Sequence, residues 1–315
     1  MMEVLIINTQ VKGESIMENI KSLTITVVAN MTSNYSEGLG NIASVQKVFK
    51  NGKVYTIRSR ESLKNAIMVQ SGMYDDLETE VDGAVQKLAN DKLNASNCRA
   101  LEGGYMSTKG TTVIRNSSFY LTDAISCDSF VNETRFHNNL YLASNNAAKN
   151  KINLQDNAKG AGLMPYQYEY DKSLKIYSLT VDLEMIGKDD NFKDREGYSE
   201  ASAEEKVTRV NSLLDAVETL TLTVKGNLDN AEPVFVVGGL SDRKTHYFEN
   251  VVKVENDKLI VNPDLKSKLN KGYSVAMLES RVFKNEDEIN RELHPIAVSE
   301  FFDKLRAQVK EYYNV

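Results

Sequence analysis

The chain has 315 residues, of which 41% are hydrophobic and 26% are charged, and its formal net charge is −6. This length and composition exclude bulk disorder, a collagen-like fibre and a disulfide-rich miniprotein, and they allow one large domain or two ordinary ones. The mild acidity argues against a nucleic-acid binder when the charge is summed over the chain, so the local distribution of charge has to be considered.

The two cysteines, Cys98 and Cys127, are too few for a disulfide framework and too far apart for a metal knuckle. A reducing, cytoplasmic location is therefore predicted. The longest apolar run, residues 23–29, is far shorter than the roughly 20 residues that a membrane helix needs. No membrane partner is expected.

The first 16 residues lack the basic start and long apolar core of a secretory signal. The codons expected for Lys12, Gly13 and Glu14 resemble a purine-rich ribosome-binding sequence, and Met17 follows at a suitable distance. One hypothesis is that translation starts at Met17 and that residues 1–16 are a non-native extension. A short disordered tail is the alternative.

The first predicted elements are a strand, a hairpin and a helix. Apolar alternation indicates a strand over residues 21–30, and Asn51-Gly52 between apolar stretches indicates a hairpin. Ser59 is a typical N-cap, and Ser71 with the following glycine ends a helix of regular apolar spacing.

The middle of the chain alternates insertions with strands. Residues 73–110 combine acidic groups with short apolar pieces and indicate an insertion, and residues 144–162 have the composition of a loop. Strands are predicted at 114–121, 136–142, 166–170 and 174–185. The last two are expected to pair with each other around Asp171-Lys172.

The last third begins with the strongest helical pattern, over residues 201–220. A short buried strand over 233–237 is expected to run into a loop, a further strand over 246–261, and two helices over 284–315 broken at Pro295. The order strand, helix, two strands, helix, strand predicts an α+β fold of the RRM-like (ferredoxin-like) kind.

Catalytic and metal-binding patterns are not visible in the sequence. The three histidines, His137, His246 and His294, are scattered, and no HExxH, CxxC, GxSxG or phosphate-binding loop occurs. The acidic pair Asp189-Asp190 is typical of a solvated loop. No catalytic residue, metal or cofactor is predicted.

Positive charge gathers between residues 41 and 70, where six cations minus one acid, Glu61, give a local charge of +5. The cations are Lys47, Lys50, Lys53, Arg58, Arg60 and Lys64. A helix start exposes amide N–H groups and the positive end of the helix dipole, so Ser59 and the neighbouring cations predict a phosphate-binding site. A solvated basic face without a ligand is the alternative.

A second candidate phosphate site follows the strand at 233–237. Gly238 and Gly239 would let a backbone approach closely, and Arg243 and Lys244 would supply charge. The alternative is a tight turn without a binding function.

These pieces, in this order, resemble a known family. The strand at 23–29, the polar segment at 30–41 and the Ser-x-x-Ser-Leu-Lys-x-Ala sequence at 59–66 resemble the backbone subunit of type I CRISPR Cascade complexes. The similarity is to the DevR-like branch, usually found in subtype I-B. One departure is Met68, where many relatives carry a basic residue.

The resemblance implies a right-hand shape with an RRM-like palm at 17–71, 113–135 and 171–315, a fingers insertion at 72–112 and a thumb insertion at 136–170. It implies copies lined up head to tail along CRISPR RNA, supporting pairing of the guide with target DNA beside other Cascade subunits, without nuclease activity. Leu163 and Met164 are candidates for a thumb wedge that separates bases.

Two other classes of protein remain as alternatives. A related repeat-RNA endoribonuclease shares this fold and would use His137 or His246. A protein-only assembly module would bind no nucleic acid.

Overall fold

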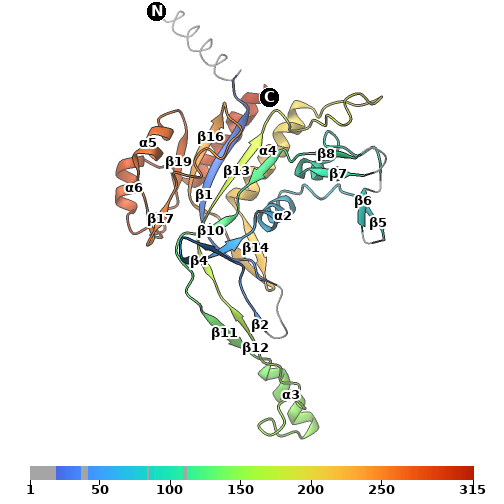
Figure 1. Cartoon of the computed structure of the whole chain (residues 1–315), viewed down its shortest axis with the longest axis vertical. Coiled ribbons are helices and arrows are strands. Elements are labelled where there is room, and N and C mark those ends of the chain that lie inside the picture. Colours follow the sequence, from blue (N-terminus) through green and yellow to red (C-terminus); the bar gives the residue numbers. More distant parts are fainter. Residues whose placement is uncertain (1–18, 37–41, 84, 89, 109–111) are drawn as a thin grey trace, which may run out of the picture.

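The computed structural model describes residues 19–36, 42–83, 85–88, 90–108 and 112–315. The extension at 1–16 and the start at Met17 lie outside the described residues. Figure 1 shows a body built on a central sheet, a lobe at one side and an arm that projects from one end.

The central sheet has eight strands in the order β19-β16-β1-β13-β10-β4-β3, and β9 also pairs with β13. Every pairing in it is antiparallel. The strands are β1 (Ser22–Thr32), β3 (Lys47–Lys50), β4 (Lys53–Arg58), β9 (Phe119–Leu121), β10 (Ala124–Ser126), β13 (Lys172–Asp182), β16 (Pro233–Ser241) and β19 (Ser274–Met277). The sequence had indicated the long β1 and the β3–β4 hairpin correctly.

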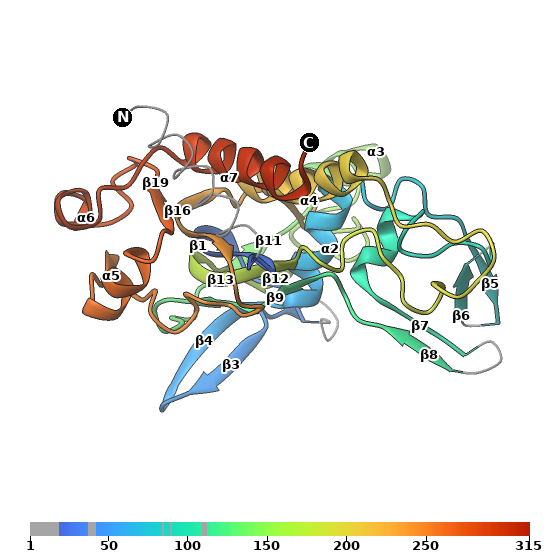
Figure 2. The ribbon, with the colours of Figure 1, turned by 90° about the horizontal axis from the view of Figure 1, so that it is seen from above.

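One face of the sheet is covered by three helices, α2 (Arg60–Gln70), α4 (Ala203–Glu218) and α7 (Val298–Tyr313). Leu23, Ile25 and Val27 of β1 are fully buried against them, because alternate residues of a strand point to the same face. Each such side chain stabilises the fold by roughly 1.5–3 kcal/mol. Figure 2 shows α4 and α7 side by side across this face.

The opposite face is partly polar. Thr24 and Thr26 of β1 are buried and hydrogen bond to Thr180 and Ser178 of β13, at 3.2 and 2.7 Å. The rest is covered by α5 (Pro263–Leu269), α6 (Glu286–Leu293) and the hairpin β17 (Val254–Glu255) and β18 (Lys258–Leu259). The strand expected over 246–261 is therefore wrong, because its apolar residues enter this second core largely from turns.

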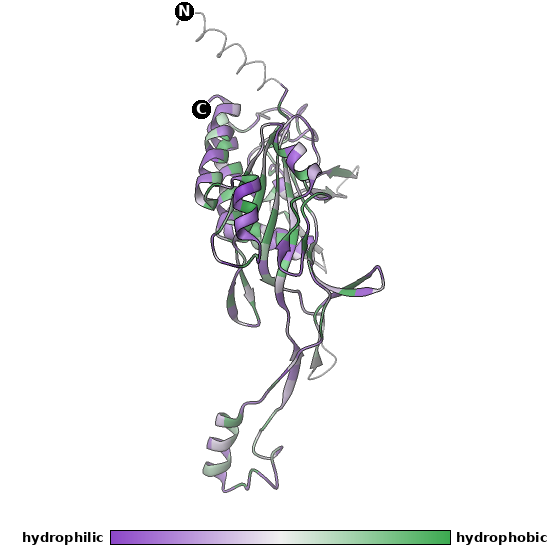
Figure 3. Ribbon diagram, turned by 90° about the vertical axis from the view of Figure 1, so that its left-hand side faces the viewer, coloured by the Kyte–Doolittle hydropathy of each residue, from purple (hydrophilic) through white to green (hydrophobic). Residues whose placement is uncertain are grey.

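The arm consists of β11 (Thr134–His137), β12 (Tyr166–Glu169), the short β2 (Ile42–Ala43) and helix α3 (Leu140–Asn150) at its end. Figure 3, turned by 90°, shows that the arm is thin from this side too. The strand expected over 136–142 ends at His137, and the loop expected over 144–162 begins inside α3. Ala143 and Ala147 are the buried residues of this helix. Alanine has the highest helix propensity, which favours a helix here over the expected loop.

The expected pairing of 166–170 with 174–185 is also wrong. Strand β12 pairs with β11 and β2, whereas β13 pairs with β1, β9 and β10. Between them the chain leaves the arm and enters the central sheet, so two neighbouring strands belong to different sheets.

The side lobe contains β5 (Thr79–Asp82), β6 (Val85–Leu88), the 3-10 helix η1 (Arg99–Gly103), β7 (Tyr105–Ser107) and β8 (Val113–Arg115). It is joined to the body by Glu102, which is fully buried and pairs with Arg115 of β8 and Arg209 of α4. The hairpin β14 (Thr221–Val224) and β15 (Asn227–Asn230) follows α4.

Candidate nucleic-acid interface

Arg58 lies inside the fold. The residue is 5% exposed, its Nε donates to the Thr32 carbonyl oxygen at 2.9 Å, and its Nη1 donates to the Ser62 hydroxyl at 3.0 Å. Burial lowers the pKa of Arg58 below the ordinary arginine value. In this structure its contacts join β1 to the start of α2, and an RNA-binding role stays a prediction.

Lys64 and Lys47 also have partners within the chain. Lys64 Nζ donates to the Gly103 carbonyl oxygen at 2.7 Å and to the Ser117 hydroxyl at 2.9 Å, and burial lowers its pKa. Lys47 pairs with Glu169 of the arm. Both lysines therefore connect elements of the fold.

The start of α2 has few open amides. The Ser59 hydroxyl accepts from the Ser62 amide, which confirms the N-cap, but the Ser59 amide donates to Asn34 Oδ1 and the Arg60 amide to Asp123 Oδ1, both at 2.8 Å. A phosphate would have to displace these internal acceptors. The predicted phosphate contact at Ser59 gains no support from this geometry.

Three cations of the predicted set are turned to solvent. Lys50 and Lys53 are exposed on the β3–β4 hairpin and form no ion pair with any described residue. The Arg60 side chain is 62% exposed, and its one ion pair with a described residue is to Glu61, which is 73% exposed. Figure 2 shows the hairpin projecting from the side of the sheet away from α4 and α7.

Gly238 and Gly239 are not in a loop. They lie inside β16, where Gly238 pairs with Ile25 and Gly239 with Thr24 of β1. A Cβ atom on Gly238 would lie 2.1 Å from the Thr24 carbonyl oxygen. The loop expectation is wrong, and Gly238 permits the close approach of two strands.

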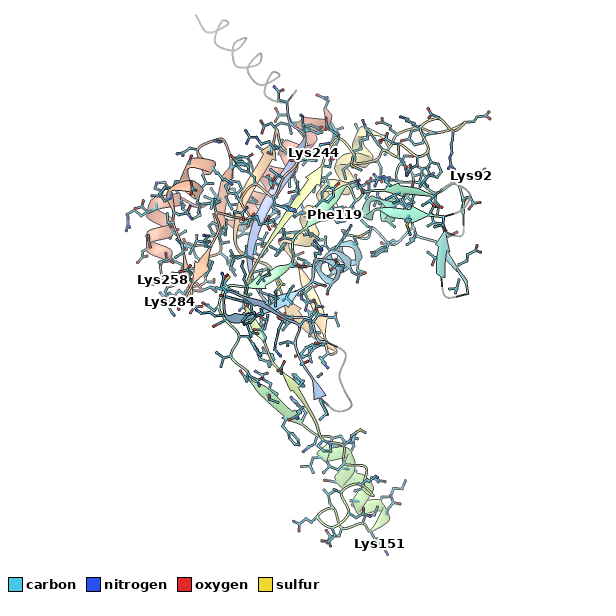
Figure 4. All side chains as sticks on the ribbon, in the orientation of Figure 1. Lys92, Phe119, Lys151, Lys244, Lys258 and Lys284 are labelled. Atoms are coloured by element: carbon cyan, nitrogen blue, oxygen red, sulfur yellow. The ribbon has the colours of Figure 1, made fainter. Side chains whose placement is uncertain are left out.

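Arg243 and Lys244 lie at the other end of the sheet. The Ser22 hydroxyl at the start of β1 donates to the Arg243 carbonyl oxygen, whereas Arg58 bonds to Thr32 at its end. At about 3.3 Å per residue the 11-residue β1 separates the two groups by roughly 30 Å. Figure 4 shows Lys244 at the end opposite to the arm.

Lys244 is engaged in ion pairs. Its Nζ lies 2.8 Å from carboxylate oxygens of Asp182 and Glu184. Partial burial lowers the pKa of Lys244, but these two hydrogen bonds outweigh burial and raise it above the ordinary lysine value. Arg243 is 62% exposed on its side chain and lines a shallow cavity of about 360 Å³ with Tyr247, Lys271 and Tyr273.

Only one of the two wedge candidates is freely exposed. Met164 is 63% exposed near the end of the arm, whereas Leu163 is half-buried. Other exposed apolar side chains on the arm are Phe136, Leu140, Tyr141 and Leu142. Figure 4 places Lys151 at the far end of this part.

The histidines proposed for an endoribonuclease are partly enclosed. His246 Nδ1 lies 2.9 Å from the Thr180 hydroxyl, and burial lowers its pKa. His137 Nε2 is buried without a hydrogen-bond partner among the described residues, and its ring stacks on Tyr166 and Tyr168. Within the described residues, no cluster of three or more His, Cys, Asp or Glu could hold a metal ion, and no helix could span a bilayer.

The sequence of the chain matches a protein-family model over most of its length. The family described as "CRISPR-associated negative auto-regulator DevR/Csa2" matches residues 23–260, more than half of the chain. The chain belongs to the DevR/Csa2 family. The resemblance to the DevR-like branch is thereby confirmed.

Solved structures share the fold of this DevR/Csa2 chain. A chain of a "CRISPR RNA-guided surveillance complex, pre-nicking" superposes with a TM-score of 0.55 at 12% identity, covering 91% of this chain and 100% of that one. A chain of a "CRISPR RNA-guided surveillance complex" gives 0.50 at 15% identity, covering 90% and 99%. No curated protein matches the sequence.

Sequence reasoning missed one group of side chains in this DevR/Csa2 chain. Tyr35, His137, Tyr166, Tyr168 and Lys225 come together where the arm meets the body. The alternation of tyrosines at 166, 168 and 170 was the available signal, since alternate residues of a strand share a face.

A pH dependence is expected from Asp171 at the root of the arm. Its Oδ2 accepts from Ser33, Thr56 and Lys175 at 2.7–2.8 Å. Burial raises the pKa of Asp171, but the Lys175 charge and these hydrogen bonds outweigh it and hold the pKa below its usual range. The carboxylate therefore stabilises the fold above the unfolded-state pKa near about 4, and this is lost as pH falls through the lower folded value.

Urea unfolding of wild type and Asp171→Asn at neutral and acid pH measures this effect. The variant is expected to be less stable at neutral pH and to lose less stability below about pH 4. Glu196→Gln, in an exposed loop, is the control and should follow wild type. If the free energy of unfolding fell by the same amount with pH in wild type and in Asp171→Asn, the low pKa of Asp171 would not be the cause.

Proposed function

We propose that this chain is a non-catalytic, RNA-binding backbone subunit of a cytoplasmic type I-B CRISPR Cascade complex. The observation that carries the proposal is the fold shared over 91% of the chain with a chain of an RNA-guided surveillance complex. Membership of the CRISPR-associated DevR/Csa2 family supports the same reading.

The topology supports an RRM-like palm. The chain runs β1, α2, β9 with β10, β13, α4 and β16, and these strands lie in the order β16-β1-β13 followed by β9 and β10. This is the split β-α-β arrangement expected of a ferredoxin-like unit. The side lobe then corresponds to fingers and the arm to a thumb.

Exposed cations support a grip on phosphate that is independent of sequence. Lys50, Lys53 and Arg60 project from the palm without burial, and a guide of any sequence has to be held through its sugar-phosphate chain. The net charge of −6 confines nucleic-acid binding to such local surfaces.

The arm supports head-to-tail assembly. Its tip exposes apolar side chains such as Tyr141, at 78%, and Leu142, at 65%, far from the body. A tip that covers the next copy makes a heterologous contact, which repeats without closing and suits a row of subunits along one CRISPR RNA. Such a row would support guide pairing with target DNA and would end on other Cascade subunits.

The test compares two charge-reversal variants of equal charge change. Lys50→Glu/Lys53→Glu/Arg60→Glu is expected to lose guide-RNA binding and keep its fold, because all three side chains are exposed. Lys193→Glu/Arg195→Glu/Lys310→Glu, exposed elsewhere, should bind as wild type.

The readouts are anisotropy of labelled CRISPR RNA and the 260/280 absorbance ratio of the purified protein. Equal RNA binding by both variants would overturn the phosphate grip. Specific cleavage of repeat RNA by wild type, lost in His246→Ala, would replace the proposal by the endoribonuclease.

A further inference from the structure

One face of the strand pair in the arm carries aromatic rings and a cation, Arg135, which forms an ion pair with Glu133. The register of β11 against β12 places His137 opposite Tyr166 and Arg135 opposite Tyr168, so these four side chains share a face. Tyr170 continues the row, with the Arg135 guanidinium 3.4 Å from its ring centroid. The alternate residues Phe136 and Gln167 lie on the other face.

Three of these rings form a nearly parallel cluster. The centroids of His137, Tyr166 and Tyr168 are 4.8–6.4 Å apart, and their planes differ by 8–19°. Tyr166 is 46% exposed, more than the other two, which are half-buried. Tyr166 is therefore the ring of this cluster that is most open to solvent.

A cation from a separate element borders the cluster. Lys225, at the turn of the β14–β15 hairpin, lies 4.5 Å from the centroid of Tyr35 and 5.8 Å from that of Tyr168. Tyr35 in turn packs edge-on against Tyr168. Among the described residues Lys225 forms no ion pair, so its charge is not neutralised by a carboxylate of the fold.

We propose that Tyr166, backed by His137 and by Tyr168 with its neighbour Lys225, stacks an unpaired base of a single-stranded nucleic acid on the strand pair of the arm. A flat π surface beside an unpaired cation is the combination that binds single strands without sequence preference. The site differs from the wedge expected at Leu163 and Met164, since Tyr166 belongs to β12 and its ring to the cluster with His137 and Tyr168. It rests on the proposed function and adds a base contact to the phosphate contacts.

The chemistry favours a base over an apolar protein segment. An apolar partner gains little from a lysine beside its contact surface, whereas a nucleotide brings a ring for Tyr166 and a phosphate for Lys225. RNA and DNA share this chemistry, so the experiment is carried out separately with each.

The experiment measures anisotropy of a fluorescein-labelled, unstructured single-stranded RNA and of a DNA of the same sequence. Tyr166→Ala is expected to weaken binding about 10-fold, and Tyr166→Phe, which keeps the ring, by less than about twofold. Tyr120→Ala removes a 40% exposed tyrosine from β9, away from the arm, and should have no effect. Lys225→Ala should reduce the slope of log affinity against log salt by about 1.

Stacking itself is detected with 2-aminopurine in the RNA. Wild type and Tyr166→Phe should quench its fluorescence, and Tyr166→Ala should not. A loss with RNA, with DNA or with both supports the site and names the strand that it holds.

Unchanged binding by Tyr166→Ala on both strands, with binding lost in Lys50→Glu/Lys53→Glu/Arg60→Glu, would overturn the stacking site and leave the proposed function intact. A change in self-association without any change in nucleic-acid binding would overturn it in favour of a second copy of the chain.

Discussion

Replacing Gly238 with alanine is expected to lower the free energy of unfolding by about 3 kcal/mol or more. The new Cβ would lie 2.1 Å from the Thr24 carbonyl oxygen and 2.7 Å from Ile25 Cα. Both atoms belong to the backbone of β1, so no side-chain rotation relieves the clash and the central strands have to separate. Urea unfolding followed by circular dichroism measures the loss.

The neighbouring glycine provides a matched control. A Cβ on Gly239 would meet the Tyr273 ring at 3.3 Å, and a ring can shift by a few tenths of an ångström. Both glycines have a positive φ that strains alanine, 157° at 238 and 156° at 239, so the two variants share this strain and differ in the backbone clash. Gly239→Ala should therefore lower the free energy of unfolding by about 1–3 kcal/mol, less than Gly238→Ala does. If the two variants unfold at the same urea concentration, close strand approach is not what requires glycine at 238.

Replacing Glu102 with glutamine is expected to lower the free energy of unfolding by about 3–5 kcal/mol. Glu102 is fully buried, and its carboxylate accepts from Arg115 at 3.0 Å, from Arg209 at 2.8 Å and from the Gly187 amide at 2.6 Å. The amide keeps the shape but leaves two nearly buried guanidinium groups, 4% and 2% exposed, without this counter-charge. Differential scanning calorimetry and urea titration would show the loss.

Glu205→Gln is the control for this cluster. Glu205 pairs with Arg99 and Arg209, but its side chain is 30% exposed, so water screens the remaining charges. Glu205→Gln should lower the free energy of unfolding by about 1 kcal/mol. An effect of Glu102→Gln no larger than that of Glu205→Gln would mean that the buried carboxylate does not secure the side lobe.

Elements with local start and stop signals could be predicted from the sequence. Helix α2 begins after Ser59 and ends at Ser71, as the cap residues indicate, and Pro295 separates α6 from α7. These signals depend on residues within one or two turns of each other.

Pairings over long distances could not be predicted. Strand β12 has its partner β11 about 30 residues upstream, whereas Asp171-Lys172 looks locally like a hairpin turn. The pair Gly238-Gly239 is likewise typical of a turn in sequence, and only the pairing with β1 explains it.

The sequence predicted which cations gather in the candidate site, but it did not predict which of them are exposed. A count of charges finds Lys50, Lys53 and Arg60 together with Arg58, but it cannot distinguish the exposed cations from the arginine that the Thr32 carbonyl holds inside the fold. The aromatic cluster was not predicted, because it brings Tyr168 of the arm together with Tyr35 and Lys225, which lie far from it in sequence.

The slender attachment of the arm has a mechanical consequence. Among the described residues, the chain reaches α3 through β11 and returns through β12, and the two-residue β2 pairs beside them. A small change of angle at Asp171 therefore moves the tip of this thin arm over a larger distance than its root. In the row of copies that we propose, each subunit would follow a stretched or compressed strand by tilting its arm, while the packed layers of its body stay unchanged.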